Sequence, residues 1–106
     1  MNAKQEFLGQ IQGKGLVCAE LRIDEDNPPQ SFCLKQDYSE TDLEVFLKSI
    51  DFNYDDGYGG QELYGFIWHT SNTWSERYEY DGSESWDFKE IPPIPEKLQS
   101  QPAQTT

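Results

Sequence analysis

Apolar residues recur with helical spacing in two segments of the chain. The clearer segment has them at positions i, i+3, i+4 and i+7, namely Leu43, Phe46, Leu47 and Ile50. This spacing places one apolar stripe along a helix. Ser39 stands just before it, where its hydroxyl can accept the backbone N–H of Asp42 and so cap the helix. A shorter helix is predicted over residues 3–11, where Phe7, Leu8 and Ile11 have helical spacing. The glycines at 13 and 15 are expected to end it.

Alternation of apolar and polar residues predicts the strands, which cover residues 16–23, 31–36, 62–69, 73–80 and 85–90. The third of these carries Tyr64, Phe66 and Trp68 on one face and Leu63 and Ile67 on the other, which is typical of a central strand. The order is α-β-β-α-β-β-β. It predicts one α+β domain over residues 1–98, with an antiparallel sheet of about five strands backed by one or two helices. Residues 91–95 are expected to run as polyproline II, and the polar residues 99–106 as a disordered tail.

The last hairpin has two possible registers. A two-residue loop places Tyr80 opposite Ser83, whereas a three-residue loop places Tyr80 opposite Glu84 and Tyr78 opposite Trp86. Because a slip of one residue exchanges the two faces of a strand, only the second register gathers the aromatic rings of this hairpin on one side. We therefore predict the three-residue loop.

Charge narrows the function classes. The chain has 20 acidic and 8 basic residues and a net charge of −12. This magnitude exceeds the net charge of roughly 2–8 that keeps a small domain soluble. Residues 51–90 hold ten of the acids, two of the bases and eleven of the fifteen aromatic residues. A disordered acidic tail would lack such rings, so we expect a folded acidic surface that repels nucleic acid and phosphate-rich membranes and attracts basic proteins. With no long apolar run and no secretion signal, the expected location is the cytoplasm.

Carboxylates along the last two strands are the candidate partner-binding groups. They are Glu76, Glu79, Asp81, Glu84 and Asp87, with Tyr78, Tyr80 and Trp86 as aromatic anchors. Residues on one face of a strand are spaced by about 6.5–7 Å, close to the phosphate separation of a nucleic-acid strand, so a row of carboxylates can mimic it. The alternative is that these acids keep the protein soluble and block edge-to-edge strand pairing.

Residues 51–62 form a second candidate site. Asp51, Asn53, Asp55 and Glu62 have the spacing of calcium ligands in an EF-hand loop, although Asp56 stands where that loop needs glycine and a strand follows it. Sugar stacking by Trp68, Trp74 and Trp86 is a further possibility, but most rings are expected in the core.

Little in the sequence points to catalysis. His69 is the only histidine, with no nucleophile or metal set around it, so we expect a structural role for it and no enzyme. Cys18 and Cys33 are expected as free thiols, with a disulfide across the hairpin as the alternative.

The run from Trp74 to Trp86, W-S-E-R-Y-E-Y-D-G-S-E-S-W, and the proline-containing residues 91–95 carry a resemblance. They resemble the C-terminal half of short acidic proteins encoded by bacteriophages and other mobile elements, over residues 55–95. The resemblance implies a setting in which small acidic proteins inhibit host nucleases, restriction enzymes or CRISPR effectors. The resulting hypothesis is a non-enzymatic inhibitor or nucleic-acid mimic that docks on a basic nuclease or other nucleic-acid-binding protein. The alternative is a small calcium- or carbohydrate-binding module.

Overall fold

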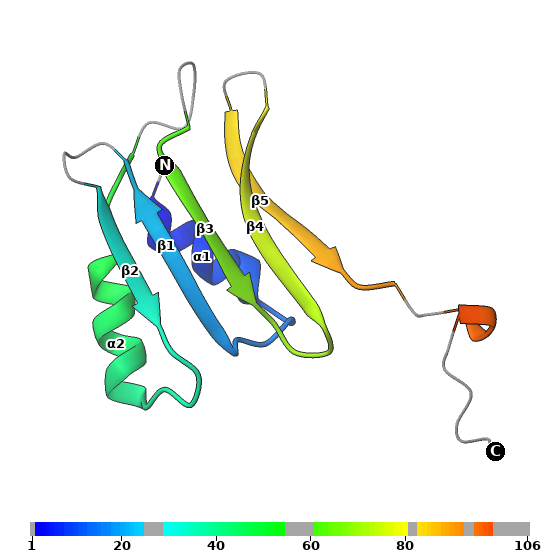
Figure 1. Cartoon of the computed structure of the whole chain (residues 1–106). Helices are drawn as coiled ribbons and strands as arrows, with labels where there is room; N and C mark the ends of the chain where they lie inside the picture. The colour runs from blue at the N-terminus through cyan, green and yellow to red at the C-terminus, as the bar shows by residue number, and fades with distance from the viewer. Residues whose placement is uncertain (1, 25–28, 55–60, 81–82, 93–94, 99–106) are drawn as a thin grey trace.

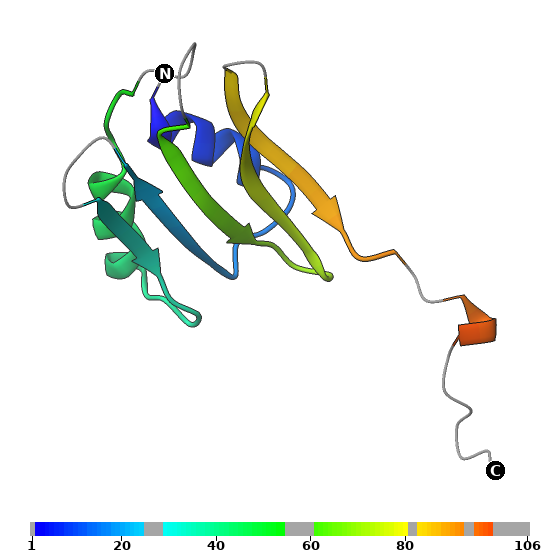
Figure 2. The ribbon, with the colours of Figure 1, turned by 45° about the horizontal axis from the view of Figure 1, so that its top comes forward.

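The fold is a five-stranded antiparallel sheet with its two α-helices on one face (Figures 1 and 2). The computed structural model describes residues 2–24, 29–54, 61–80, 83–92 and 95–98. The strand order is β2-β1-β3-β4-β5. The elements are α1 (Ala3–Ile11), β1 (Cys18–Ile23), β2 (Gln30–Leu34), α2 (Glu40–Ser49), β3 (Leu63–Trp68), β4 (Thr73–Tyr80), β5 (Ser83–Glu90) and a short 3₁₀ turn, η1 (Glu96–Leu98). The predicted α+β class and element order are confirmed.

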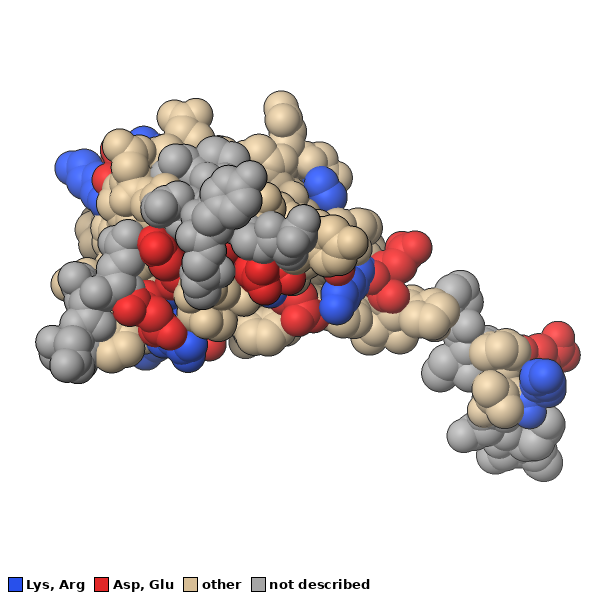
Figure 3. Space-filling model, turned by 90° about the horizontal axis from the view of Figure 1, so that it is seen from above, with Lys and Arg blue, Asp and Glu red and all other residues tan. Residues whose placement is uncertain are grey.

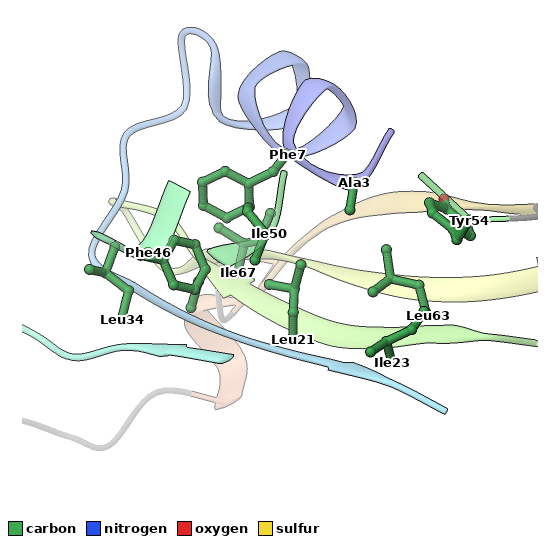
Figure 4. Packing of buried hydrophobic residues seen from close by; sticks show 11 residues of the cluster. Ala3, Phe7, Leu21, Ile23, Leu34, Phe46, Ile50, Tyr54, Leu63 and Ile67 are labelled. Atoms are coloured by element: carbon green, nitrogen blue, oxygen red, sulfur yellow. The ribbon is translucent and has the colours of Figure 1, made fainter. Parts of the chain in front are cut away.

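The hydrophobic core lies between the helices and the sheet face that they cover (Figure 4). Phe7 of α1 and Phe46 of α2 meet edge to face, with ring centroids 5.3 Å apart. Leu21 of β1 and Ile67 of β3 are fully buried beneath them. Because strand side chains alternate between faces, every second residue of the central strands enters this core and the others point to the opposite face. We call the helix-covered side the inner face and the opposite side the open face.

Side-chain caps fix both helix starts. The Ser39 hydroxyl accepts from the Asp42 backbone N–H at 3.1 Å, and the Asp42 carboxylate accepts from the Ser39 N–H at 3.0 Å, which completes a capping box. Asn2 caps α1 by accepting from the Gln5 N–H at 2.9 Å. The predicted Ser39 cap is confirmed.

The central position of β3 is also confirmed, and it requires a glycine. Gly65 lies opposite Leu21 in the pairing of β3 with β1. A Cβ at Gly65 would lie 2.4 Å from the Glu20 carbonyl oxygen and 3.0 Å from the Leu21 Cα. Both are backbone atoms of the paired strand, so a side chain could be accommodated only by separating β3 from β1.

The predicted register of the last hairpin is wrong. Tyr80 pairs with Ser83 and Arg77 with Trp86, which is the two-residue register, and β5 begins at Ser83 instead of residue 85. The rings are consequently divided: Trp86 packs against the core, while Tyr78 and Tyr80 point to the open face. Gathering rings on one side was a weaker constraint than burying Trp86 and bringing the Glu84 carboxylate to the Arg77 guanidinium.

We predict that Gly65→Ala lowers the free energy of unfolding by about 2–4 kcal/mol, because the new methyl group collides with the backbone of β1. The matched control is Gly9→Ala. Gly9 is exposed inside α1 with nothing near its would-be Cβ, so alanine there should raise stability by about 0.5–1 kcal/mol. Urea unfolding of both variants followed by circular dichroism is the measurement. Equal stability of the two variants would contradict the close approach of β1 and β3.

Candidate functional site

The open face of the sheet carries a band of aromatic side chains that neither helix covers. Its rings come from β3 and β4 and are Tyr64, Phe66, Trp68, Trp74, Tyr78 and Tyr80. Trp68 is 43% exposed and Tyr80 is 76% exposed. The expectation that most rings lie in the core is therefore wrong for Trp68 and Trp74, although Trp86 does pack against the core. Exposed apolar patches of this kind mark interaction surfaces.

The rings of the open face adjoin one another across the strands. Trp68 lies directly opposite Trp74, and the Phe66 and Trp68 ring centroids are 5.8 Å apart. On the side of β1, the Arg22 guanidinium lies 4.4 Å from the centroid of Tyr64. Cys18 of β1 pairs with Trp68. Rigid strands thus present the rings as one continuous surface, at a small entropic cost on binding.

Acidic side chains accompany these rings. Glu76 and Asp87 lie opposite each other on the open face. The Lys89 ammonium is 3.0 Å from the Glu76 carboxylate and 3.9 Å from that of Asp87. Hydrogen bonds from Lys89 and from the Trp74 indole N–H lower the pKa of Glu76, so this carboxylate is charged at neutral pH.

The predicted row of partner-binding carboxylates is divided between the two faces. Glu76 and Asp87 belong to the open face, whereas Glu79 and Glu84 lie opposite each other on the inner face. Asp81 lies outside the described residues. The prediction treated all acids of the two strands as one row. Successive side chains of a strand point to opposite faces of the sheet, so these acids are divided between the two faces. Figure 3 shows acidic side chains also at the end of the sheet where β1 ends and β3 begins.

Glu84 is not available to a partner, because it is buried in a network around Arg77. The Arg77 side chain is fully buried, and its guanidinium is 3.3 Å from the carboxylates of Glu84 and of Glu6. It also donates to the Tyr54 hydroxyl at 2.6 Å, and that hydroxyl donates to Glu6. The arrangement joins α1, the segment after α2, and strands β4 and β5.

The same carboxylate binds the start of β3. Glu84 accepts the backbone N–H groups of Glu62 and Leu63 at 2.7 Å and 3.0 Å. The Arg77 guanidinium lies 5.2 Å from the centroid of the Trp86 ring. The sequence motif that contains Arg77 and Glu84 therefore has a structural role within the domain, a role that sequence reasoning missed. The available signal was that Arg77 is one of only two bases among the ten acids of residues 51–90.

The described part of the proposed calcium loop has other hydrogen-bond partners. Asp51 and Asn53 both accept from the side-chain amide of Asn2, at 3.1 Å and 3.2 Å. Asp55 lies outside the described residues, and the Glu62 backbone is held by Glu84. Within the described residues, no group of three or more metal-ligating side chains comes together. Calcium binding stays a prediction.

His69 lies in a second buried network, which links α1 to the sheet. Its Nδ1 is 2.8 Å from the Gly15 carbonyl oxygen and its Nε2 is 2.7 Å from the Ser75 hydroxyl. Gln10 of α1 donates to the same hydroxyl at 2.8 Å. A carbonyl only accepts, so Nδ1 carries the proton and Nε2 accepts from Ser75. A serine beside an imidazole suggests a nucleophile and its base, but Ser75 is 0% exposed and no substrate reaches it.

The two cysteines are free thiols, as predicted. Cys33 pairs with Glu20 across β1 and β2, so the two cysteines are not directly opposite each other. Burial raises the pKa of the Cys18 thiol. This disfavours the thiolate, the reactive form of cysteine.

Comparison of the chain with family models, with curated proteins and with solved structures finds no match. Among the described helices, none is both long and apolar enough to cross a membrane. The resemblance of residues 55–95 to phage-encoded acidic proteins therefore stays a prediction.

We predict that Glu84→Ala lowers the free energy of unfolding by about 3–5 kcal/mol, because it leaves the buried Arg77 charge short of a partner and two backbone N–H groups without an acceptor. Asp87→Ala, an exposed carboxylate three residues along β5, is the control and should change stability by less than about 1 kcal/mol. Urea unfolding distinguishes them. A mild effect of Glu84→Ala would show that the network does not hold the sheet together.

Tyr54 should remain protonated in strongly alkaline solution. Burial, followed by the hydrogen bond to Glu6, raises its pKa. A raised folded-state pKa stabilises the fold below the unfolded-state value, about 10 for tyrosine, and this contribution is lost as pH rises above that value. Tyrosinate absorbance should show one of the six tyrosines ionising only as the chain unfolds. Tyr54→Phe should abolish that late step; its persistence would assign the late step to another tyrosine.

Proposed function

We propose that this chain is a non-enzymatic binding protein that docks on a basic protein through the open face of its sheet. The observation that carries the proposal is the uncovered aromatic band on β3 and β4, which includes Phe66, Trp68 and Tyr78. Tyrosine and tryptophan are the side chains most enriched at the energetic centres of protein interfaces. A rigid sheet also presents them with little rotamer entropy left to lose.

Charge complementarity favours a basic partner. The chain carries −12, and Glu20, Glu76 and Asp87 belong to the open face. Arg22 and Lys89, two bases of the open face, are paired with Asp24 and Glu76. Such a field accelerates encounter with a positively charged surface, while the rings supply the contacts that hold it. Direct binding of nucleic acid is disfavoured, because bases that stack on rings need a positive groove for their phosphates.

Within this proposal, the partner class is a nuclease or another nucleic-acid-binding protein of the cytoplasm, and the chain is its inhibitor. The resemblance to phage-encoded acidic proteins supports the same class. A regular phosphate mimic has less support, because Glu84 is buried and Glu79 lies on the face opposite to Glu76. We therefore base affinity on the aromatic band and assign the carboxylates to steering.

A carbohydrate is the second candidate ligand. A cavity of about 380 Å³ has Trp68 and Trp74 in its wall together with Gln36, Asn72 and Thr73. Indole faces pack on the apolar faces of sugar rings, and amides and hydroxyls can exchange hydrogen bonds with sugar hydroxyls. The net charge does not contribute to this mode of binding.

The proposal predicts that the double variant Phe66→Ser/Tyr78→Ser loses a partner that the wild-type chain captures from host lysate at low salt. The partner should be basic and should be released by high salt. With the partner purified, the dissociation constant should rise at least about tenfold in the double variant, because the two rings are anchors.

Leu8→Gln is the matched control, since Leu8 is an exposed apolar residue of α1 on the helical side of the molecule. This variant should bind as the wild type does. Glu20→Lys/Asp87→Lys should mainly slow association and weaken its salt dependence. A captured partner that binds the double variant as tightly as the wild type would overturn the assignment of the open face. Retention on immobilised oligosaccharides instead, lost in Trp74→Ala, would favour the carbohydrate.

A further inference from the structure

A groove separates the edge strand β2 from helix α2, away from the open face. We call it the β2–α2 groove. It has a volume of about 320 Å³ and is lined by Cys33, Leu34, Lys35, Asp42, Val45, Phe46 and Ser49. Val45 is 62% exposed although it is apolar and stands in the middle of α2. The groove therefore has an apolar floor and one unburied apolar wall residue.

The backbone beside the groove is an open strand edge. β2 pairs with β1 on one side, and no other described strand pairs with it on the other. The Asp24 N–H donates to the carbonyl of Glu62, at the point where β1 runs against the start of β3. In an antiparallel sheet, the backbone groups of successive residues point alternately to the two neighbouring strands. Because Asp24, an even-numbered residue, bonds to the β3 side, the even-numbered residues of β1 bond to β3 and the odd-numbered ones bond to β2.

This alternation fixes the direction of the β2 backbone. Leu21 pairs with Phe32 and Ala19 with Leu34, so Phe32 and Leu34 turn their backbone groups toward β1. Ser31 and Cys33 consequently turn their N–H and C=O groups toward the open edge. These groups are donors and acceptors arranged at the spacing of a strand, and Cys33 lines the groove itself.

We propose that the β2–α2 groove binds an extended peptide segment of another protein. The segment adds to β2 as a sixth strand through the backbone groups of Ser31 and Cys33. It inserts one apolar side chain between Val45 and Phe46. Strand addition beside a helix is an established mode of peptide recognition, in which backbone hydrogen bonds give affinity and side-chain pockets give specificity.

Charge and geometry both select the occupant. The groove wall carries one carboxylate, Asp42, and one ammonium group, Lys35, so the charge of the wall itself is balanced. The net charge of −12 on the whole chain favours a segment that carries a basic residue next to its apolar one. β2 has five residues, so the paired part of the segment is short. The β5 edge is the alternative site for strand addition. There, however, α1 lies beside the last strand.

The inference goes beyond the proposed function, because it concerns a different surface and a different ligand. Its test is selection of random ten-residue peptides, displayed on phage, against the wild-type chain. The selected peptides are then synthesised and their dissociation constants measured by fluorescence anisotropy. We expect an apolar residue next to a basic one in the enriched sequences, and slowed hydrogen exchange of the Ser31 and Cys33 amides in the complex.

Two variants address the two parts of the site. Val45→Lys places a charge on the groove wall, and Cys33→Pro removes an edge N–H at a position where proline is tolerated. Each should weaken peptide binding at least about tenfold. Glu44→Lys, a charge change at the neighbouring exposed residue of α2, and Phe66→Ser, on the open face, should leave the peptide affinity within about twofold.

Circular dichroism verifies that each variant is folded. If a variant is unfolded, the amides protected from hydrogen exchange in the complex of the wild-type chain locate the peptide-binding site instead. Peptides that bind Val45→Lys and Cys33→Pro as tightly as the wild type would overturn the inference. So would an absence of enrichment, or protection confined to β5. Loss of peptide binding in Phe66→Ser alone would instead assign the peptides to the open face.

Discussion

The buried guanidinium of Arg77 anchors the packing of α1 on strands β3, β4 and β5. It brings together Glu6 of α1, Tyr54 after α2, and Glu84 of β5. Because a buried charge without partners is costly, packing of these elements is favourable only when it brings Glu6 and Glu84 to the guanidinium. Through Glu84 the network also fixes the first backbone groups of β3. The register of β4 with β5 follows from the same contacts, because only the observed pairing brings the Glu84 carboxylate to Arg77.

The inward orientation of Arg77 determines which face carries the aromatic rings of β4. With Arg77 and Glu84 turned inward, Tyr78 and Tyr80 must point away from the helices, since strand side chains alternate. Two short helices cover the inner face and leave the other face open. The part of the exposed band that lies on β4 is thus a consequence of how the domain buries its charges, and the whole band is the surface on which we propose that a protein partner docks.

The two proposed binding surfaces differ in the physics that each uses. The open face offers rigid rings with acidic neighbours, and its affinity would depend on salt. The β2–α2 groove offers unpaired backbone groups beside Val45 and Phe46, and its affinity would depend on a peptide adopting a strand. They lie on different sides of the sheet, so one protein could engage both with separate segments, or two proteins could bind independently.

The elements, their order and the class of fold could be predicted from the sequence alone. Local signals suffice there: the Ser39 cap, the apolar stripe through Phe46, and the two apolar faces of β3 that made it central. Which carboxylates are accessible, in contrast, depends on contacts between residues that are distant along the chain. A slip of one residue in the last hairpin exchanges the faces, and the groups that fix it, Glu6 and Tyr54, are far from Arg77 along the chain. No local pattern reports such distant contacts, and for the same reason the groove between β2 and α2 could not be foreseen.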